Sequence, residues 1–355
     1  MKSVGLFSLS PKGRHLIGLD VSTTSVKLVE LQKQGGGLHL KSYGIEQLEP
    51  GWVVDKNIVN SDEVGDAIDR LLRRSKAGSK EAATAVSGSA VITKIIDMEA
   101  DLSESDREAQ IRLDAEQYIP YPLSEVNLDF EVLGPADTAG LVKVLLAASR
   151  SENVDQRVET LLIGGLTTKV VDVESYAIER AFSLVLDSLP HDPKVVALVD
   201  IGHKQTTLYI AKDGEFIYSR EQNFGGEQLT DAIQNRYSIP YHDAMIGKHE
   251  YTLPADYRES VLAPFVENTV QQISRSLQFY FSSSQYNTVD HIVLCGGTAA
   301  LPGLVEMVQE RMGGLVSLAN PFEGMSINNR IDNFALQKDA PSLMAACGLA
   351  LRSFD

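Results

Sequence analysis

The stretch Leu16–Leu31, LIGLDVSTTSVKLVEL, contains the most informative pattern in the sequence. It is typical of an apolar strand that ends on Asp20, a turn of small hydroxyl residues, and a second apolar strand. Backbone N–H groups can line the concavity of such a turn and hold a phosphate, and Lys27 adds a cation. Asp20 could hold magnesium through waters, because Mg²⁺ takes few carboxylates and keeps several waters. An ordinary hairpin with a Ser/Thr turn explains this stretch equally well unless a second such loop occurs.

A second loop of this kind occurs in Val195–Ile210, VVALVDIGHKQTTLYI. A strand again ends on an aspartate, Asp200, and a polar turn again leads into another strand. When the aspartates are aligned, Gly202 takes the place of Ser22 and permits close backbone approach to a phosphate. This internal repeat predicts two duplicated halves, whose loops could clamp one polyphosphate between them.

A third signal follows the expected strand His291–Leu294, which runs into Cys295-Gly296-Gly297-Thr298. A strand, a double glycine and a helix start let the backbone lie flat against a base or a ribose. Gly-Gly turns are common, so this signal depends on the two loops before it. Glu227 opens an expected helix after Gly225-Gly226. It could reach a ribose hydroxyl, or could simply favour the helix dipole.

Composition indicates an ordinary globular protein with more than one domain. The chain has 355 residues, of which 43% are hydrophobic and 23% charged, so two or more domains are expected. The net charge of −16 argues against nucleic acid or an anionic membrane as the main partner, since both need clustered Lys and Arg. The basic residues from Arg70 to Lys80 are more typical of a solvated helix face. Cys295 and Cys347 are too few for a disulfide scaffold or a zinc site, and they fit a reducing cytoplasm.

No stretch predicts a membrane span or a leader peptide. None supplies the roughly 18 consecutive apolar residues that cross a bilayer. Residues 1–16, MKSVGLFSLSPKGRHL, are interrupted by Ser, Pro, Lys and Arg, which is not the pattern of a signal peptide. Association with a membrane should therefore come through a partner.

Between the two loops, strand and helix signals form a compact insert. We expect a strand, a helix, two strands and a second helix within residues 88–164. Apolar residues at Val154, Val158, Leu161 and Leu162 define the expected inner face of the second helix.

Two further helices are expected outside the insert. Ser61 could cap a helix that runs from Asp62 to Arg74. A long amphipathic helix is expected over Asp256–Tyr280, with Phe279 in its buried face.

Together these stretches resemble the superfamily of actin, heat-shock chaperone and sugar-kinase ATPases. Asp20 with its hydroxyl turn looks like the first phosphate loop of that superfamily, Asp200-Ile201-Gly202 like the second, and Leu294-Cys295-Gly296-Gly297-Thr298 like its adenosine loop. The insert is similar to the subdomain that distinguishes the bacterial division protein FtsA from actin. Ala115–Val132, AEQYIPYPLSEVNLDFEV, resembles the PilM family of type IV pilus assembly proteins. The resemblance covers nearly the whole chain.

The resemblance implies an α/β, actin-like ATPase fold, in which two duplicated lobes surround a nucleotide cleft and an FtsA-like small α+β subdomain is inserted. The implied first lobe has its core in residues 14–87, the insert in 88–164, and its return and hinge helix in 165–194. The second lobe would span 195–335, and a C-terminal helix over 336–355 would return to the first lobe.

The same resemblance implies a site for ATP or ADP with Mg²⁺, in which the two aspartates position the ion through waters. The implied nucleotide contacts are Asp20, Ser22, Thr23, Thr24, Lys27, Asp200, Gly202, Thr206, Glu227, Gly296, Gly297 and Thr298. Glu174 lies where the superfamily often carries the residue that orients the attacking water, although a helix-capping carboxylate explains it equally well. We expect hydrolysis to be slow or absent, with nucleotide acting as a conformational ligand.

For function, the resemblance implies a cytoplasmic ATP-binding adaptor rather than a metabolic enzyme. Such an adaptor binds the N-terminal cytoplasmic tail of the inner-membrane protein PilN, in a groove between the first lobe and the insert. It couples the PilN, PilO and PilP alignment complex to motor or platform proteins of the pilus machine, and it could self-associate. Tyr118–Pro122 could contact the tail, or could be a helix stop packed on the core of the insert.

Two other classes of function share these loops. A filament-forming actin homologue similar to FtsA is one, although no C-terminal amphipathic helix for membrane binding is evident in the sequence. A small-molecule kinase is the other. It would need an acceptor site with a general base, for which the sequence shows no separate motif.

Overall fold

The computed structural model describes residues 15–250 and 252–355. These residues form two compact units. Unit 1 extends to Ala181 and includes residues 325–331 and 345–355, whereas unit 2 comprises residues 182–324 and 332–344. Residues 1–14 lie outside the described residues. They include most of the stretch 1–16, for which no leader peptide was expected, and residue 14, the expected start of the first lobe.

Unit 1 is built on a six-stranded mixed sheet in the order β10-β6-β1-β2-β3-β16. Its strands are β1 Ile17–Val21, β2 Ser25–Gln34, β3 Gly37–Gln47, β6 Glu81–Val86, β10 Thr167–Val173 and β16 Ser326–Ile327. The first three strands form an antiparallel meander, which confirms the predicted hairpin. β6 and β10 extend the sheet in parallel beyond β1. In the register of the hairpin, Asp20 lies opposite Lys27.

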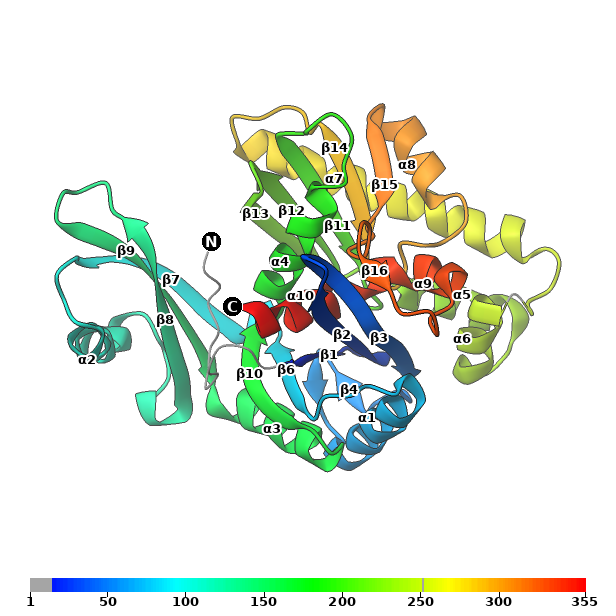
Figure 1. Ribbon diagram of the computed structural model, residues 1–355. Coiled ribbons are helices and arrows are strands. Elements are labelled where there is room, and N and C mark those ends of the chain that lie inside the picture. Colours follow the sequence, from blue (N-terminus) through cyan, green and yellow to red (C-terminus); the bar gives the residue numbers. More distant parts are fainter. Residues whose placement is uncertain (1–14, 251) are drawn as a thin grey trace. The chain divides into compact units, whose positions relative to one another are not determined.

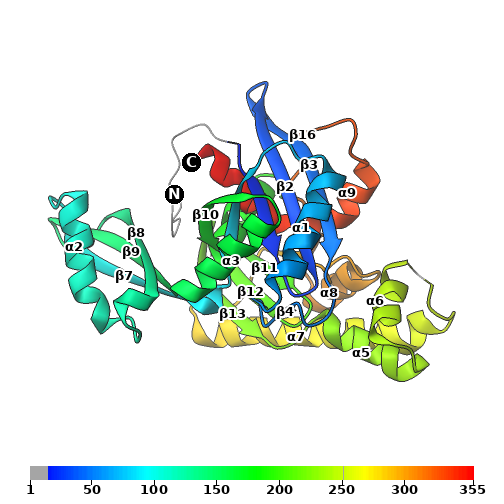
Figure 2. The same ribbon diagram turned by 90° about the horizontal axis from the view of Figure 1, so that it is seen from below.

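Two helices pack against this sheet and against each other, as Figure 2 shows for α1 Ser61–Ser75 and α3 Ser151–Ile163. Their shared core consists of aliphatic side chains from both helices and from β1 and β2. A short hairpin, β4 Val53–Val54 with β5 Asn57–Ile58, contacts α3.

The residue that caps α1 differs from the expected one. Asn60, rather than Ser61, accepts a hydrogen bond from the backbone N–H of Glu63, at 3.3 Å. Asn60 keeps the extended backbone that a capping residue needs, whereas Ser61 is already the first helical residue.

The insert is a three-stranded antiparallel sheet with a helix, α2 Glu104–Asp114, packed on one side (Figure 1). Its strands, in the order β7-β9-β8, are β7 Val91–Glu99, β8 Val126–Pro135 and β9 Leu141–Arg150. Ile111 of α2 is fully buried against Met98 and Val144 of this sheet. Leu145 and Ala147 belong to a second apolar cluster, which includes residues of β6 and β10. The predicted order of strand, helix, strand and strand is confirmed.

The inner face of α3 is only partly the expected one. Val154 and Leu161 are buried, but Val158 and Leu162 are exposed. Arg157 is buried on this helix instead. The prediction was wrong at Val158 and Leu162. It also missed Arg157, whose guanidinium is buried because it finds backbone carbonyl partners that apolar periodicity does not detect.

Unit 2 has a five-stranded sheet in the order β13-β12-β11-β14-β15. Its strands are β11 Val195–Ile201, β12 Thr206–Lys212, β13 Glu215–Gln222, β14 His291–Cys295 and β15 Leu315–Leu318. β11 and β12 form the second predicted hairpin, and β14 and β15 run parallel to β11. The α-helices of this unit are α5 Gly226–Tyr237, α6 Tyr241–Glu250, α7 Ala263–Ser283, α8 Leu304–Met312 and α9 Asn333–Asp339.

The buried face of α7 differs from the prediction at one residue. Phe279 is 51% exposed, and the guanidinium of Arg220 lies 3.9 Å from its ring centroid. Tyr280 is buried in its place. The helical repeat explains the difference, because the position that follows Ile273 and Leu277 on the same face is 280 rather than 279. Among the described residues, no helix combines the length and the apolar character required to span a membrane.

Two helices meet in unit 1 with their backbones in contact. α4 Glu174–Leu186 leaves β10, and α10 Met344–Ala350 follows a 3-10 turn over Ala340–Leu343. A Cβ atom added at Gly348 of α10 would overlap the carbonyl of Ala177 in α4. A Cβ at Gly18 of β1 would overlap the carbonyl of Ala346 in α10. Only glycine therefore allows α10 to lie against both β1 and α4.

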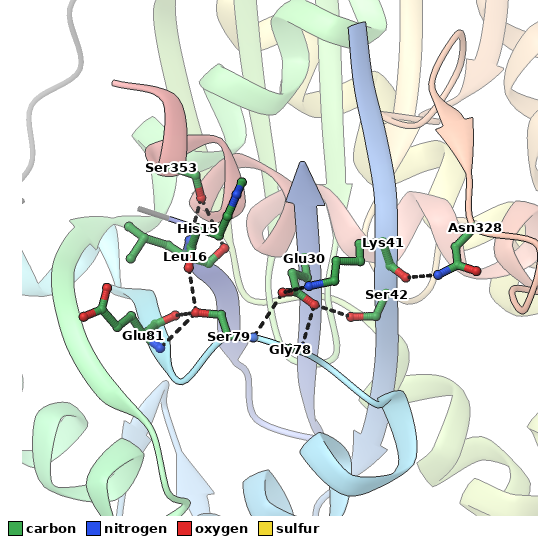
Figure 3. A network of polar contacts seen from close by, with 10 residues as sticks. All are labelled: His15, Leu16, Glu30, Lys41, Ser42, Gly78, Ser79, Glu81, Asn328 and Ser353. Carbon is green, nitrogen blue, oxygen red and sulfur yellow. Dashed lines mark hydrogen bonds and ion pairs between the residues drawn. The ribbon is translucent and has the colours of Figure 1, made fainter. Parts of the chain in front are cut away.

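A buried carboxylate joins β2, β3 and the loop that follows α1, as Figure 3 shows. Glu30 Oε1 accepts from Lys41 Nζ at 2.9 Å and from the Ser79 N–H at 3.1 Å. Oε2 accepts from the Gly78 N–H at 2.9 Å and from Ser42 Oγ at 3.1 Å. Burial acts to raise the pKa of Glu30, but these bonds and the charge of Lys41 outweigh it, so the pKa lies below its ordinary value.

We expect Gly348→Ala to lower the free energy of unfolding by about 3 kcal/mol, because the added methyl group meets backbone that cannot give way. Gly37→Ala is the matched control, since a Cβ at Gly37 meets no atom within 4 Å. Urea denaturation followed by circular dichroism measures both variants. Equal stability of the two variants would show that α10 can move away from α4 without cost.

We expect Glu30→Gln to cost about 1–3 kcal/mol of stability at pH 7, because an amide cannot accept all the hydrogen bonds that the carboxylate accepts. A carboxyl group whose pKa is lowered by folding stabilises above its unfolded pKa, and this contribution disappears as pH falls through the folded pKa. The difference between wild type and variant should therefore shrink in acid. Denaturation curves at pH 7 and pH 3 check this expectation, and a difference that stays constant would contradict it.

Candidate functional site

The first loop holds three of the predicted residues close together in unit 1. Lys27 Nζ lies 2.9 Å from Asp20 Oδ2 and 3.4 Å from Ser22 Oγ. The Ser22 N–H donates to the Ser25 carbonyl at 3.0 Å and closes the turn. Thr23 and Thr24, also predicted, are half-buried in this turn.

The Asp20–Lys27 ion pair sets the charge of this loop. Each side chain is 12% exposed, so both charges are largely removed from water and each depends on the other. A phosphate at this loop would share Lys27 with Asp20. A divalent ion carried with that phosphate would in turn give Asp20 a second cationic partner.

Glu174, the predicted water-orienting residue, is the first residue of α4 and follows directly on β10. Its Oε2 accepts from Lys56 Nζ at 2.6 Å. Lys56 lies in the turn between β4 and β5, where it and Asp55 adopt left-handed backbone conformations. No sequence signal pointed to this contact, because Lys56 and Glu174 are 118 positions apart.

Arg157, on α3, holds the backbone of Lys56 in place. Its Nη2 donates to the Lys56 carbonyl at 2.7 Å and its Nε donates to the Ala85 carbonyl of β6 at 2.6 Å. Burial lowers the pKa of Arg157, and the charges of Glu174 and Asp20 oppose this shift. A buried cation in unit 1 therefore interacts electrostatically with both Glu174 and Asp20.

The second loop, in unit 2, is joined through backbone groups to the two glycine segments. The carbonyl of Gly202 accepts from the Gly226 N–H at 3.0 Å and from Thr298 Oγ1 at 2.9 Å. The Thr298 N–H donates to the Ile201 carbonyl at 3.0 Å, and the Gly202 N–H donates to Gln205. Segments 200–206, 225–227 and 296–298 thus form one cluster.

The glycines of this cluster differ in their surroundings. Gly296 has φ +90°, and a Cβ there would overlap the Asp200 carboxylate. A Cβ at Gly225 would lie 2.5 Å from the Gly202 and His203 carbonyl oxygens. Gly297 has no atom within 4 Å of its Cβ position. Gly296 and Gly225 therefore permit the close packing, whereas Gly297 borders open space, where a flat ligand could lie.

Thr206 is buried, and its hydroxyl donates to the Phe224 carbonyl at 2.7 Å. This bond fixes the chain just before Gly225. The structure thus gives Thr206 a supporting contact within the cluster.

Glu227 opens α5 beside two basic side chains that sequence reasoning missed. Its Oε1 lies 4.0 Å from both Lys204 Nζ and His203 Nε2. The Tyr241 hydroxyl lies 3.0 Å from the same His203 nitrogen. Burial, followed by the charges of Lys248 and Lys204, lowers the pKa of His203 to about 4. His203 is therefore neutral at pH 7, and Lys204 is the cation closest to Glu227 in this group.

The residues present suit a nucleotide better than a metal held by protein ligands alone. Within residues 15–250 and 252–355, no group of three or more His, Cys, Asp or Glu side chains could hold a metal ion. Asp20 and Asp200 are each the penultimate residue of a strand that leads into a polar turn, which suits contact with a magnesium ion through its waters. The hydroxyls, the lysine and the glycine segments suit phosphates and a flat base.

Comparison with known proteins gives a consistent result. Residues 18–354 match the family described as type IV pilus assembly protein PilM. The chain is similar to a chain of a solved PilM-PilN type IV pilus biogenesis complex, with a TM-score of 0.77, 27% identity, and coverage of 96% of this chain and 98% of the other.

Two more distant relatives share the fold. The ethanolamine utilization protein EutJ from Carboxydothermus hydrogenoformans has a TM-score of 0.59 at 17% identity, over 98% of this chain and 92% of its own. The cell division protein FtsA of Bacillus subtilis is 22% identical over 360 residues, which cover 86% of this chain and 78% of that protein. The predicted actin-like ATPase fold is confirmed.

We expect the His203 ring to titrate near pH 4, far below the roughly 6.5 of an unperturbed histidine. The unfolded chain takes up this proton at higher pH than the folded protein does, so stability falls as pH falls between these values. NMR titration of the ring signals measures the midpoint. Tyr241→Phe should leave the midpoint low, because burial is the main cause of the shift. A midpoint near 6.5 would show that the ring is solvated.

Proposed function

The chain belongs to the family of type IV pilus assembly protein PilM, and we propose on that premise that it is an ATP-binding adaptor of the pilus assembly machinery. It binds the N-terminal cytoplasmic tail of PilN and responds to nucleotide. The observation that carries the proposal is the match over residues 18–354, together with the likeness to a solved complex that contains PilN.

ATP or ADP is the ligand that the two loops fit best. Lys27, Ser22, Thr23, Thr24 and Gly202 contact the phosphates, and Thr206 supports the second loop. Asp20 and Asp200 position Mg²⁺ through waters. Glu227 contacts the ribose, and Gly296, Gly297 and Thr298 border the adenosine. The open space at Gly297 and the cation at Lys27 support these roles.

Hydrolysis is slow in this proposal, and nucleotide acts as a conformational ligand. The carboxylate expected to orient the attacking water, Glu174, is already paired with Lys56. A ligand shifts a conformational equilibrium only through its different affinity for the two states.

The PilN tail docks against the insert and the remainder of unit 1. Asp129 and Glu131 lie on β8 of the insert. Burial raises the pKa of Asp129 to about 6 and that of Glu131 to about 7. Glu131 Oε2 is buried without a hydrogen-bond partner among the described residues, so the carboxyl group favours its neutral form here.

The segment between α2 and β8 offers a second contact. Tyr118 and Tyr121 are partly exposed beside Lys94 and Arg150, whereas Ile119 is buried in the core of the insert. The two tyrosines could contact the tail while Ile119 anchors the segment.

Through PilN, the protein lies on the cytoplasmic side of the inner membrane. There it links the PilN, PilO and PilP alignment complex to motor or platform proteins. In this arrangement the partner supplies the contact with the membrane.

Calorimetric titration with ATP and Mg²⁺, with and without a peptide of the PilN cytoplasmic tail, tests the proposal. We expect both ligands to bind, and a change in either affinity caused by the other gives their coupling free energy. Gly296→Ala should abolish ATP binding, because the added methyl group overlaps Asp200, and should leave peptide binding intact. Gly314→Ala is the control, since a Cβ there meets no atom within 4 Å. If ATP binds and the peptide does not, the adaptor proposal fails.

A further inference from the structure

The ion pair between Lys56 and Glu174 lies where three segments of unit 1 meet. Lys56 belongs to the β4–β5 turn, Glu174 begins α4, and Arg157 belongs to α3, the helix that follows β9 of the insert. The Lys56 and Glu174 side chains are both mostly buried, and their charged atoms are 2.6 Å apart. The contact is therefore a defined part of the fold rather than a loose surface pair.

The backbone conformation of Lys56 and a hydrogen bond to its carbonyl fix the position of this residue. Its φ of +63° follows one of +49° at Asp55, so the turn is held in a conformation that L-residues seldom adopt. The Arg157 guanidinium donates both to the Lys56 carbonyl and to the Ala85 carbonyl of β6. Because Arg157 bridges the turn and the sheet, the turn cannot move without breaking a buried hydrogen bond.

The pair also decides what the Glu174 carboxylate can do. A carboxylate that orients an attacking water must accept a hydrogen bond from that water at about 2.6–3.2 Å. The Lys56 ammonium already donates a hydrogen bond to Glu174 Oε2 at such a distance. A carboxylate has two oxygens, so while the pair persists Glu174 can offer a water Oε1 in the orientation that Lys56 imposes, and it can offer Oε2 only after Lys56 has moved.

We propose that Lys56 is a positioning residue that restrains the Glu174 carboxylate and thereby slows hydrolysis, and that Arg157 ties this restraint to α3 and, through α3, to the insert. The inference rests on the proposed nucleotide-binding function and goes beyond it, since it assigns a cause to slow turnover. It also couples the position of the insert to the rate of nucleotide hydrolysis. A partner that shifts α3 would withdraw Arg157 from the Lys56 carbonyl and release Glu174.

Single-turnover phosphate release from ATP with Mg²⁺, measured on the full chain, tests the restraint. We expect Lys56→Met to accelerate release by about tenfold or more, because a positioned general base contributes about 10²–10⁴-fold. Affinity for ATP should stay unchanged. Lys56→Arg should restore slow release, and Lys56→Met with Glu174→Gln should return the rate to the wild-type level.

Lys169→Met is the matched control. Lys169 Nζ lies 3.5 Å from Glu81 Oε1 in a partly buried pair of the same unit, and its loss should leave the rate unchanged. Arg157→Lys should accelerate release, because a lysine cannot bridge both carbonyls. Its thermal melting checks that it folds.

The possible outcomes separate this inference from the proposed function. If ATP binds and Lys56→Met releases phosphate no faster than wild type, the restraint is wrong and nucleotide binding stands. If the double variant is as fast as Lys56→Met, the acceleration does not depend on Glu174 and the restraint is also wrong. If folded Arg157→Lys releases phosphate at the wild-type rate, the link to the insert is wrong. If wild type fails to bind ATP, both proposals fall.

Discussion

Unit 1 depends on the backbone contact of α10 with β1 and with α4. Gly18 and Gly348 permit this contact, because a side chain at either position would overlap a carbonyl. The same C-terminal segment brings Arg352 to within 3.6 Å of Asp172, a fully buried carboxylate of β10 that is also bonded to Arg180 of α4 at 3.1 Å. A buried charge is costly unless it is paired, so the segment completes both the packing and the electrostatics of the sheet that carries the first loop.

The two loops follow the same plan of strand, aspartate, turn and strand, but different interactions hold them. The first is organised by side chains, through the Asp20–Lys27 ion pair. The second is organised by backbone, through the Gly202 carbonyl and the glycines that pack around it. A side-chain pair can rearrange around an incoming phosphate by rotating about single bonds, whereas a packed backbone cluster is already in place. The first loop is therefore the more adaptable of the two loops, and the second is the more pre-organised.

Local patterns predicted much of this fold. Both hairpins and the order of the insert are confirmed, because paired strands and amphipathic helices leave their signal in neighbouring residues. The errors have physical causes. Phe279 lies one position away from the buried face of α7. Arg157 is buried because its guanidinium donates to backbone carbonyls that are distant in sequence. The contacts of Lys56 with Glu174 and of His203 with Tyr241 join residues 118 and 38 positions apart, so only the assembled structure could reveal them.

Unit 1 is assembled from three separate stretches of the chain, and the last of them, residues 345–355, contains Gly348 and Arg352. A ribosome makes this stretch after the whole of unit 2. Until this stretch is made, α10 cannot cover the apolar face of the sheet around β1, and Asp172 lacks one of its two arginines. Unit 2 ends at residue 344, so it can complete its own core earlier. Unit 1 therefore departs from the usual order, in which the N-terminal domain folds first during synthesis, because it needs the last residues made.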